Sequence, residues 1–354
     1  MFLETIGKYI IFIYAKFIRR QLSMRKGIRN LKKLMKIKES GVLLILIVIM
    51  LIPGIISENF FSAYNIIILF RSLAFLGLVA LGESIVILTG EIDLSVGSVA
   101  GFSGIITGFA LSHWNMPPVM AFSVGIIIGI LCGFINGTII SKLKVSSLVV
   151  TLGTMGVFEG LTLVLTKGTA VMGLPESFFV LGQGKLFGLP LPIFILLGLF
   201  IILSFILKKT KIGMKLYSVG SNSEAAEIIG LKVNRIKTLA FIISSLFASI
   251  AGIIMVSRLG TAQPTIGAEW LMPSVAAVVI GGTALTGGEG TPFGTLIGAT
   301  IMVVIENCIV IMGISPYWQK AVSGLVVVFA ISLDAMRKIM RERSKLRNEK
   351  ECVN

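Results

Sequence analysis

The sequence predicts an all-α polytopic membrane protein of about ten transmembrane helices, with the N- and C-termini both cytoplasmic. Hydrophobic residues make up 55% of the 354 residues and charged residues only 14%, whereas a soluble domain usually carries about 25% charged residues. The apolar residues come in blocks of about 20, the length that crosses a bilayer as a helix. The third observation is that lysine and arginine are distributed very unevenly between these blocks.

Three regions follow along the chain. Residues 1–38 hold 11 lysine and arginine residues against one acid, Glu4, and the basic arm extends over residues 1–40. Their one apolar stretch is short and has no small-residue cleavage site after it, so we expect a basic cytoplasmic arm on anionic lipid rather than a signal peptide. Residues 41–336 form the expected transmembrane domain, and residues 337–354 form a basic cytoplasmic tail.

Ten apolar spans divide the central region. We expect them at residues 41–57, 66–89, 94–112, 119–143, 148–165, 191–207, 238–256, 270–281, 293–312 and 318–336; the eighth is short and rich in glycine. With the N-terminus inside, 27 of the 32 basic residues fall on the cytoplasmic side and four outside, as the positive-inside rule requires. Losing one span would put the tail or the basic segment 208–237 outside, which favours an even number.

The long polar interruption at 208–237 is the most distinctive segment. It carries seven basic residues and two acids, and reads KKTKIGMKLYSVGSNSEAAEIIGLKVNRIK. Its centre predicts a short helix, because Ser221, Asn222 or Ser223 can act as an N-cap and Gly230 suits the stop. A short capped helix between membrane spans must lie outside the lipid, where it can press on a partner.

Two other inside turns are rich in glycine, TGEIDLSVGS at 89–98 and GGTALTGGEGTPFG at 281–294. Neither is a phosphate-binding loop, because the required GxxxxGK followed by Ser or Thr is missing. Two interpretations stay open: tight re-entrant turns buried between spans, or mobile elements beside a translocation path. Asp93 or Ser95 can cap the span that follows the first turn.

Several kinds of site are not predicted. Cys132, Cys308 and Cys352 have neither disulfide nor metal-ligand spacing, and His113 stands alone. We expect no cofactor bound by this chain, no catalytic constellation and no nucleic acid, since membrane topology accounts for the net charge of +15.

Charged and polar residues inside the spans are the remaining candidates. Arg71, Glu159, Glu306 and Glu83 are either structural pairs or face an aqueous cavity. Met155, Phe158 and Met302 suit ordinary packing. Candidates for a translocation path, chosen by residue type and position, are Asp93, Ser95, Asn136, Thr151, Thr154 and Asn307.

Three motifs in order, TGEIDLSVGS, YSVGSNSEAAEIIG and VAAVVIGGTALTGGEGTPFGTLIGA, resemble the permease subunits of bacterial sugar ABC importers. That family serves ribose, xylose, arabinose, galactose and the furanosyl signal autoinducer 2. The resemblance covers about residues 40–336. It implies a ten-span fold in the plasma (inner) membrane, a second permease copy or a sister permease, a separate ATPase subunit that uses ATP and Mg, and an extracytoplasmic sugar-binding protein.

The resemblance also implies site residues. Ser221, Glu224, Ala225, Ala226 and Gly230 match the segment that docks on the ATPase. One departure is Glu91, where many relatives carry a second glycine. The outside segments at 168–190 and 260–270 are the expected docking surfaces for the binding protein.

Two other function classes stay open on the residues alone. An ion-coupled secondary transporter with broken helices would use Asp93 and Glu91 at the first glycine-rich turn. A non-transporting membrane scaffold or enzyme is the other class, and its distinguishing feature, a catalytic constellation of residues, is absent from the sequence. The sequence does not name the sugar, nor does it decide whether two copies of the chain pair.

Overall fold

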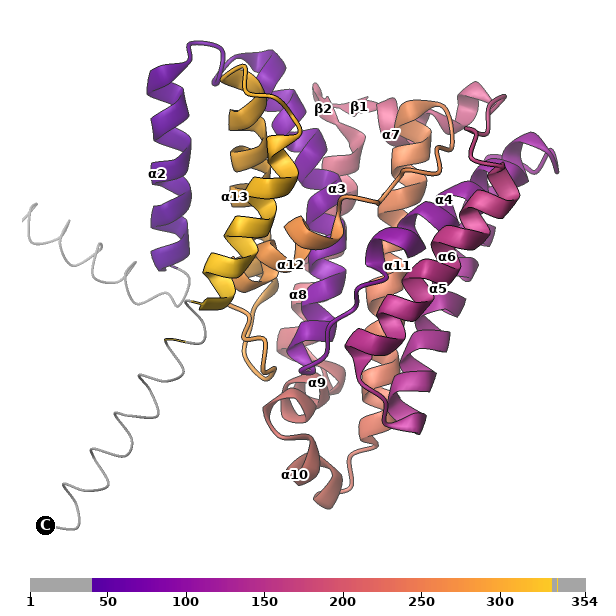
Figure 1. Cartoon of the computed structure of the whole chain (residues 1–354), viewed down its shortest axis with the longest axis vertical. Helices are drawn as coiled ribbons and strands as arrows, with labels where there is room; N and C mark the ends of the chain where they lie inside the picture. Colours follow the sequence, from indigo (N-terminus) through magenta and orange to yellow (C-terminus); the bar gives the residue numbers. More distant parts are fainter. Residues whose placement is uncertain (1–39, 333–335, 337–354) are drawn as a thin grey trace, which may run out of the picture. The chain divides into compact units, whose positions relative to one another are not determined.

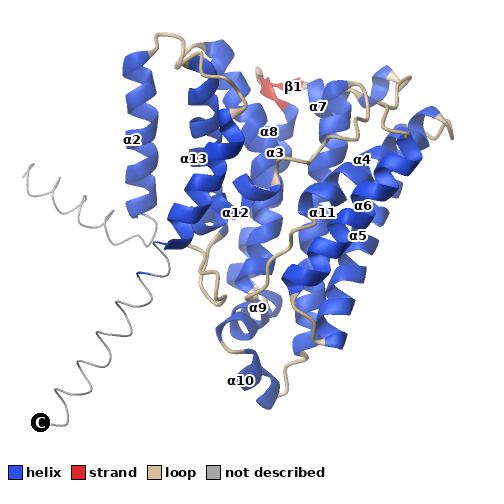
Figure 2. Ribbon diagram, viewed as in Figure 1, coloured by secondary structure: helices blue, strands red, loops and turns tan. Residues whose placement is uncertain are grey.

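The computed structural model describes residues 40–332 and Met336, which are mostly helical (Figure 2). The expectations for the basic arm before Ser40 and for the tail lie outside the described residues. The helices are α2 (Ser40–Ile56), α3 (Ala63–Leu88), α4 (Val96–Ser112), α5 (Pro118–Leu143), α6 (Ser147–Thr166), η1 (Glu176–Phe178), α7 (Val180–Gln183), α8 (Leu191–Lys209), α9 (Lys211–Ser221), α10 (Ser223–Ile228), α11 (Val233–Leu259), α12 (Leu271–Ile280), α13 (Pro292–Ile311) and a last helix at Trp318–Ser332.

The polytopic all-α prediction is confirmed. Six helices are long and apolar enough to cross a bilayer, namely α3, α5, α6, α8, α11 and α13. Four shorter apolar helices, α2, α4, α12 and the last helix, coincide with the other four predicted spans. The shortest, α12, has 10 residues and is about 15 Å long, half the thickness of the hydrocarbon core.

The chain divides after Ile45 into two compact units, and everything below concerns the second. At its centre lies α11, which packs against α3, α4 and α5. Four glycines at four-residue spacing on α5 explain the close approach: a Cβ at any of them would overlap atoms of α11, of α4, or of both. Small residues at this spacing let membrane helices pack backbone to backbone. The four are Gly125, Gly129, Gly133 and Gly137.

The long connections lie at opposite ends of the bundle (Figure 1). At one end lie α9, α10 and the 281–291 turn; at the other lie α7 and the hairpin of β1 (Lys185–Leu186) and β2 (Leu189–Pro190). After α3 ends at Leu88, the chain turns back into the bundle without helical structure before α4 begins. The re-entrant interpretation of the 89–98 stretch therefore describes its path.

The 208–237 segment contains two short helices where the sequence predicted one. Thr210 caps α9 by accepting from the amides of Ile212 and Gly213. The Asn222 side chain caps α10 and accepts from the Ala225 amide at 2.9 Å. Gly230 follows α10 with φ of +85°, a conformation that glycine adopts without strain. The cap and the stop are thus confirmed, with Asn222 as the capping residue.

Candidate coupling segment and translocation cavity

The exposed side chains of α10 define one face of this short helix. Glu224 and Ala225 are exposed, while Ala226 is 2% exposed and belongs to the main hydrophobic core. Ala226 therefore holds α10 against the chain and does not offer its methyl group to a partner. Ile228 and Ile229 are 86% and 72% exposed. The sequence analysis missed this apolar pair, although two isoleucines inside a polar segment were the available signal.

The neighbouring helix α9 lies against the end of α3 and the 281–291 turn, and Gly287 of that turn lies against Gly90 of the 89–98 turn. Gly220 sits so close to the Leu88 carbonyl and the Gly288 amide that a Cβ would overlap them. The Gly288 amide donates to the Leu88 carbonyl at 2.9 Å. These backbone contacts join the end of α3, the end of α9 and the 281–291 turn. We refer to Leu88, Gly220 and Gly288 as the glycine junction.

A side-chain bond reinforces the same contact. The Tyr217 hydroxyl on α9 donates to the Gly290 carbonyl at 2.7 Å. Burial raises the pKa of the Tyr217 phenol, so the hydroxyl stays protonated and remains a donor. Gly287 and Gly288 have φ of +83° and +76°, so the turn that meets α9 takes a backbone path that other residues rarely adopt.

Backbone amides of the 89–95 turn are held by side chains of two helices. The Ile92 amide donates to Ser147 Oγ at 3.3 Å, and the Leu94 amide donates to Thr151 Oγ1 at 3.0 Å, both on α6. The Asp93 amide donates to Glu83 Oε1 on α3 at 3.1 Å. Buried non-helical backbone needs such partners, because it lacks the hydrogen bonds that a helix makes within itself.

Asp93 continues this network toward α5. Its Oδ1 accepts from the amide and the hydroxyl of Ser95, at 2.9 and 2.6 Å, and Asn136 Nδ2 donates to Ser95 Oγ at 2.8 Å. The predicted capping role is therefore wrong: Ser95 precedes α4, but no side-chain cap bond reaches the first turn. Its hydroxyl is already engaged by Asp93 and Asn136. Within the described residues, Glu83 Oε2, Asp93 Oδ2 and Asn136 Oδ1 are buried without a hydrogen-bond partner.

An ion pair joins the same turn to the start of α11. Lys237 Nζ lies 2.6 Å from Glu91 Oε1, and the two side chains are 21% and 16% exposed. Glu91 was noted only as a departure from the family pattern. Its partner comes from the end of the polar 208–237 segment, so a charge on the turn contacts the segment that also carries α9 and α10.

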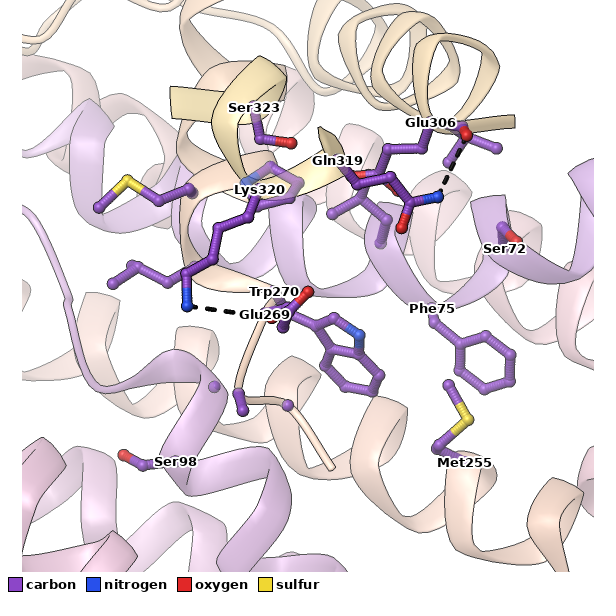
Figure 3. Close-up of a pocket in the computed structure, with 18 of the residues that line it drawn as sticks. Ser72, Phe75, Ser98, Met255, Glu269, Trp270, Glu306, Gln319, Lys320 and Ser323 are labelled. Atoms are coloured by element: carbon purple, nitrogen blue, oxygen red, sulfur yellow. Dashed lines mark hydrogen bonds and ion pairs between the residues drawn. The ribbon is translucent and has the colours of Figure 1, made fainter. Parts of the chain in front are cut away.

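The turn ends at a cavity of about 400 Å³. Leu94, Gly97 and Ser98 line one side of it, at the junction of the turn with α4. The remaining walls come from α3, α6, α11, α13, the 267–273 segment and the last helix. Figure 3 shows Glu306, Gln319 and Ser323 together on one wall, and Phe75 and Trp270 on another.

The six predicted path residues lie outside this lining. Asp93, Ser95, Asn136 and Thr151 belong to the buried network just described, and Thr154 donates to the Thr151 carbonyl at 3.3 Å. Asn307 exchanges two side-chain hydrogen bonds with Asn65, at 3.0 and 2.8 Å. Their role in translocation stays a prediction.

Other residues singled out in the sequence do reach the cavity. Glu159, Glu306 and Met155 line it, while Phe158 and Met302 are buried as the packing interpretation expects. Arg71 Nε is buried and has no hydrogen-bond partner among the described residues. In that same part of the chain, no group of three or more His, Cys, Asp or Glu side chains is placed to hold a metal ion.

The apolar bundle, the re-entrant turn and the cavity define a membrane transport permease. Comparison with known proteins agrees: the family model described as "Branched-chain amino acid transport system / permease component" matches residues 65–331. The chain belongs to this permease family, the membrane components of ABC transporters. It is accordingly a multi-pass protein of the bacterial plasma (inner) membrane.

Curated relatives in this family are sugar import permeases. The chain is 40% identical over 297 residues to the ribose import permease protein RbsC of Bacillus subtilis, covering 83% of this chain and 92% of that protein. It is 31% identical over 320 residues to the autoinducer 2 import system permease protein LsrC of Escherichia coli O9:H4, covering 90% and 93%. It is also 31% identical over 310 residues to the L-arabinose ABC transporter permease protein AraH of Azospirillum brasilense, covering 88% and 91%.

Proposed function

We propose that this chain is the membrane-spanning subunit of an ATP-driven importer that translocates a monosaccharide or a related small polar solute. One observation carries the proposal. The exposed helix α10 follows α9, and α9 contacts the end of α3 and the 281–291 turn. Gly287 of that turn lies against Gly90 of the 89–98 turn, which ends at the cavity. A push on α10 therefore has a continuous protein path to the cavity lining.

The finer organisation belongs to the same proposal. The chain has a basic cytoplasmic arm at 1–40, a ten-span permease domain at 41–336 and a cytoplasmic tail at 337–354. The 208–237 segment docks on a separate ATPase subunit through Ser221, Glu224, Ala225 and Gly230, with Ala226 anchoring α10 from inside. ATP and Mg are bound by that partner. A sugar-binding protein delivers the solute from outside, and a second permease, identical or a sister, completes the pore.

The exposed isoleucine pair extends the docking surface. Two large apolar side chains exposed on a cytoplasmic helix indicate a protein-binding face, and the adjacent Glu224 offers a charge to a basic residue of the ATPase. We expect Ile228→Asp combined with Ile229→Asp to leave the permease in the membrane but to prevent co-purification of the ATPase. The control is Val145→Asp, which puts one such charge on an exposed apolar residue of the turn between α5 and α6.

A second candidate is an ion-coupled transporter. The buried Glu83–Asp93 contact at the break between α3 and α4 favours it, because broken helices with acids hold coupling ions in such proteins. Uptake into vesicles separates the two. Vanadate should abolish uptake driven by the ABC mechanism, and an ionophore should leave it intact; the opposite pattern would establish ion coupling and reject our proposal.

A further inference from the structure

The charges around the cavity indicate an uncharged ligand. Three acids and two bases line it, so the lining has no excess of positive charge. Lys320 Nζ lies 3.9 Å from Glu269 Oε1, and the Arg258 guanidinium stands 5.4 Å from the centre of the Phe75 ring. A phosphorylated or carboxylate ligand needs an excess of cationic donors, whereas this lining has more acids than bases.

One wall presents oriented hydrogen-bond acceptors. Gln319 Nε2 donates to the Glu306 backbone carbonyl at 3.2 Å, so the amide group is fixed and its oxygen remains as an acceptor. Ser323, on the last helix, is 4% exposed and lines the same cavity. Figure 3 shows these three side chains side by side on the cavity wall. Acceptors held in this way suit ligand hydroxyl groups.

Another wall presents aromatic surface. Trp270 is stacked on Phe75, with ring centroids 6.2 Å apart and planes at 19°, and Arg258 also stands over the Phe75 ring. Phe75 is thereby fixed between two neighbours, and the half-buried indole of Trp270 faces the cavity (Figure 3). An indole offers an apolar face and one N–H donor.

We propose that this cavity is a sugar-binding site within the permease itself, which takes a neutral polyhydroxylated molecule of monosaccharide size. Glu306 and Gln319 accept bonds from its hydroxyl groups, and Trp270 packs against the apolar face of its ring. The cavity volume of about 400 Å³ lies in the usual range for small-molecule sites. The proposal rests on the transport function above and adds that the permease, and not only the delivering protein, selects the solute.

Direct binding to the purified full-length permease, without ATPase or binding protein, tests this site. Trp114→Phe and Trp318→Phe leave Trp270 as the one tryptophan, so its fluorescence reports the cavity. The probes are D-ribose, L-arabinose, D-xylose, D-galactose, ribose 5-phosphate and L-leucine. We expect a saturable change with at least one neutral sugar, and none with ribose 5-phosphate or leucine.

Two variants and a control locate the binding. Glu306→Leu and, separately, Gln319→Leu should each weaken sugar binding, by about tenfold for Glu306→Leu, because each removes a hydrogen-bond acceptor from the cavity wall. Glu176→Gln, in the exposed η1 helix outside the cavity, should bind as the parent does. Having two variants guards against a folding defect in one, and size-exclusion profiles identify such a defect.

The outcomes separate this site from the transport function. No saturation by any neutral sugar, tighter binding of leucine or ribose 5-phosphate, or unchanged affinity in both folded variants would overturn the site. If stimulated ATP hydrolysis and vanadate-sensitive uptake remained normal in the complex, the transport proposal would stand without it. Sugar binding without vanadate-sensitive uptake would reject the transport proposal instead.

Discussion

Breaking the Glu91–Lys237 ion pair should uncouple the 208–237 segment from the cavity. Lys237→Met removes the charge and keeps the length of the side chain, and Glu91→Gln removes the opposite charge. The two side chains are 21% and 16% exposed, so the pair is neither a surface ion pair nor a fully buried one. Exposed pairs contribute about 0–1 kcal/mol, and breaking a fully buried pair costs about 3–5 kcal/mol. A value of about 1–3 kcal/mol follows for this pair.

That free energy sets the size of the functional effect. The 89–95 turn can be held against the start of α11 or released from it. Since 1.4 kcal/mol corresponds to a factor of ten, losing the pair shifts this equilibrium toward the released turn by about 5- to 150-fold. A released turn no longer follows the start of α11, so a movement of the coupling segment reaches the cavity only through the glycine junction. We therefore expect stimulation of ATP hydrolysis by loaded binding protein to fall severalfold in either variant, while basal hydrolysis continues.

The assay compares stimulated and basal ATP hydrolysis of the reconstituted complex. Lys142→Met is the matched control, because Lys142 is an exposed base in the last turn of the neighbouring α5. The exchange of Glu91→Lys with Lys237→Glu should recover part of the stimulation, and a double-mutant cycle isolates the pair from the single losses. Wild-type stimulation and uptake in both single variants would show that the pair carries no coupling.

Three further predictions follow from the same geometry. Gly220→Ala should reduce uptake at normal expression because its methyl group overlaps the Leu88 carbonyl, whereas Gly198→Ala on α8, with open space around it, should not; equal uptake in the two would reject the glycine junction as a functional contact. With the native cysteines removed, an impermeant thiol reagent on intact cells should label Gln183→Cys and spare Ser221→Cys, and labelling of the latter would refute the topology. Asp93→Ala should lower the free energy of unfolding in detergent by about 2–4 kcal/mol, because it removes the acceptor of two buried hydrogen bonds from Ser95; a loss below 1 kcal/mol would contradict this network.

Local signals explain what the sequence could predict. Apolar blocks of about 20 residues gave helices whose ends agree within a few residues, because burying backbone in lipid leaves few alternatives to a helix. The two ends of α10 were also predictable from local signals, because Asn222 caps its start and Gly230 follows its end, within nine residues of sequence. The orientation of α10 was not predictable, since a helix of six residues is too short for a periodic pattern to show which face is buried.

Long-range contacts explain what the sequence could not predict. Tyr217 and Gly290 are 73 residues apart, and Glu91 and Lys237 are 146 apart, so no local pattern pairs them. The path candidates were chosen as polar residues at membrane depth. Most such residues, however, must satisfy one another's hydrogen bonds when buried, as Asn307 does with Asn65. The residues that reach the cavity depend on how the helices are rotated about their axes, which tertiary packing decides.

The 208–237 segment is tied to the end of α3 by the glycine junction and to the 89–95 turn by the ion pair, and the two ties differ in stiffness. At the glycine junction, backbone meets backbone: the Gly288 amide bonds the Leu88 carbonyl and Gly220 leaves no room for a side chain between them. A displacement of α9 at this junction moves the end of α3 and the 281–291 turn directly, because no side chain lies between them whose rotamer could change instead. Lys237 reaches Glu91 through four rotatable methylene groups, so that tie can stretch or break as α11 moves. Under the proposed function, the glycine junction transmits the movement of α9. The ion pair determines how strongly the 89–95 turn is held against α11 before that movement occurs.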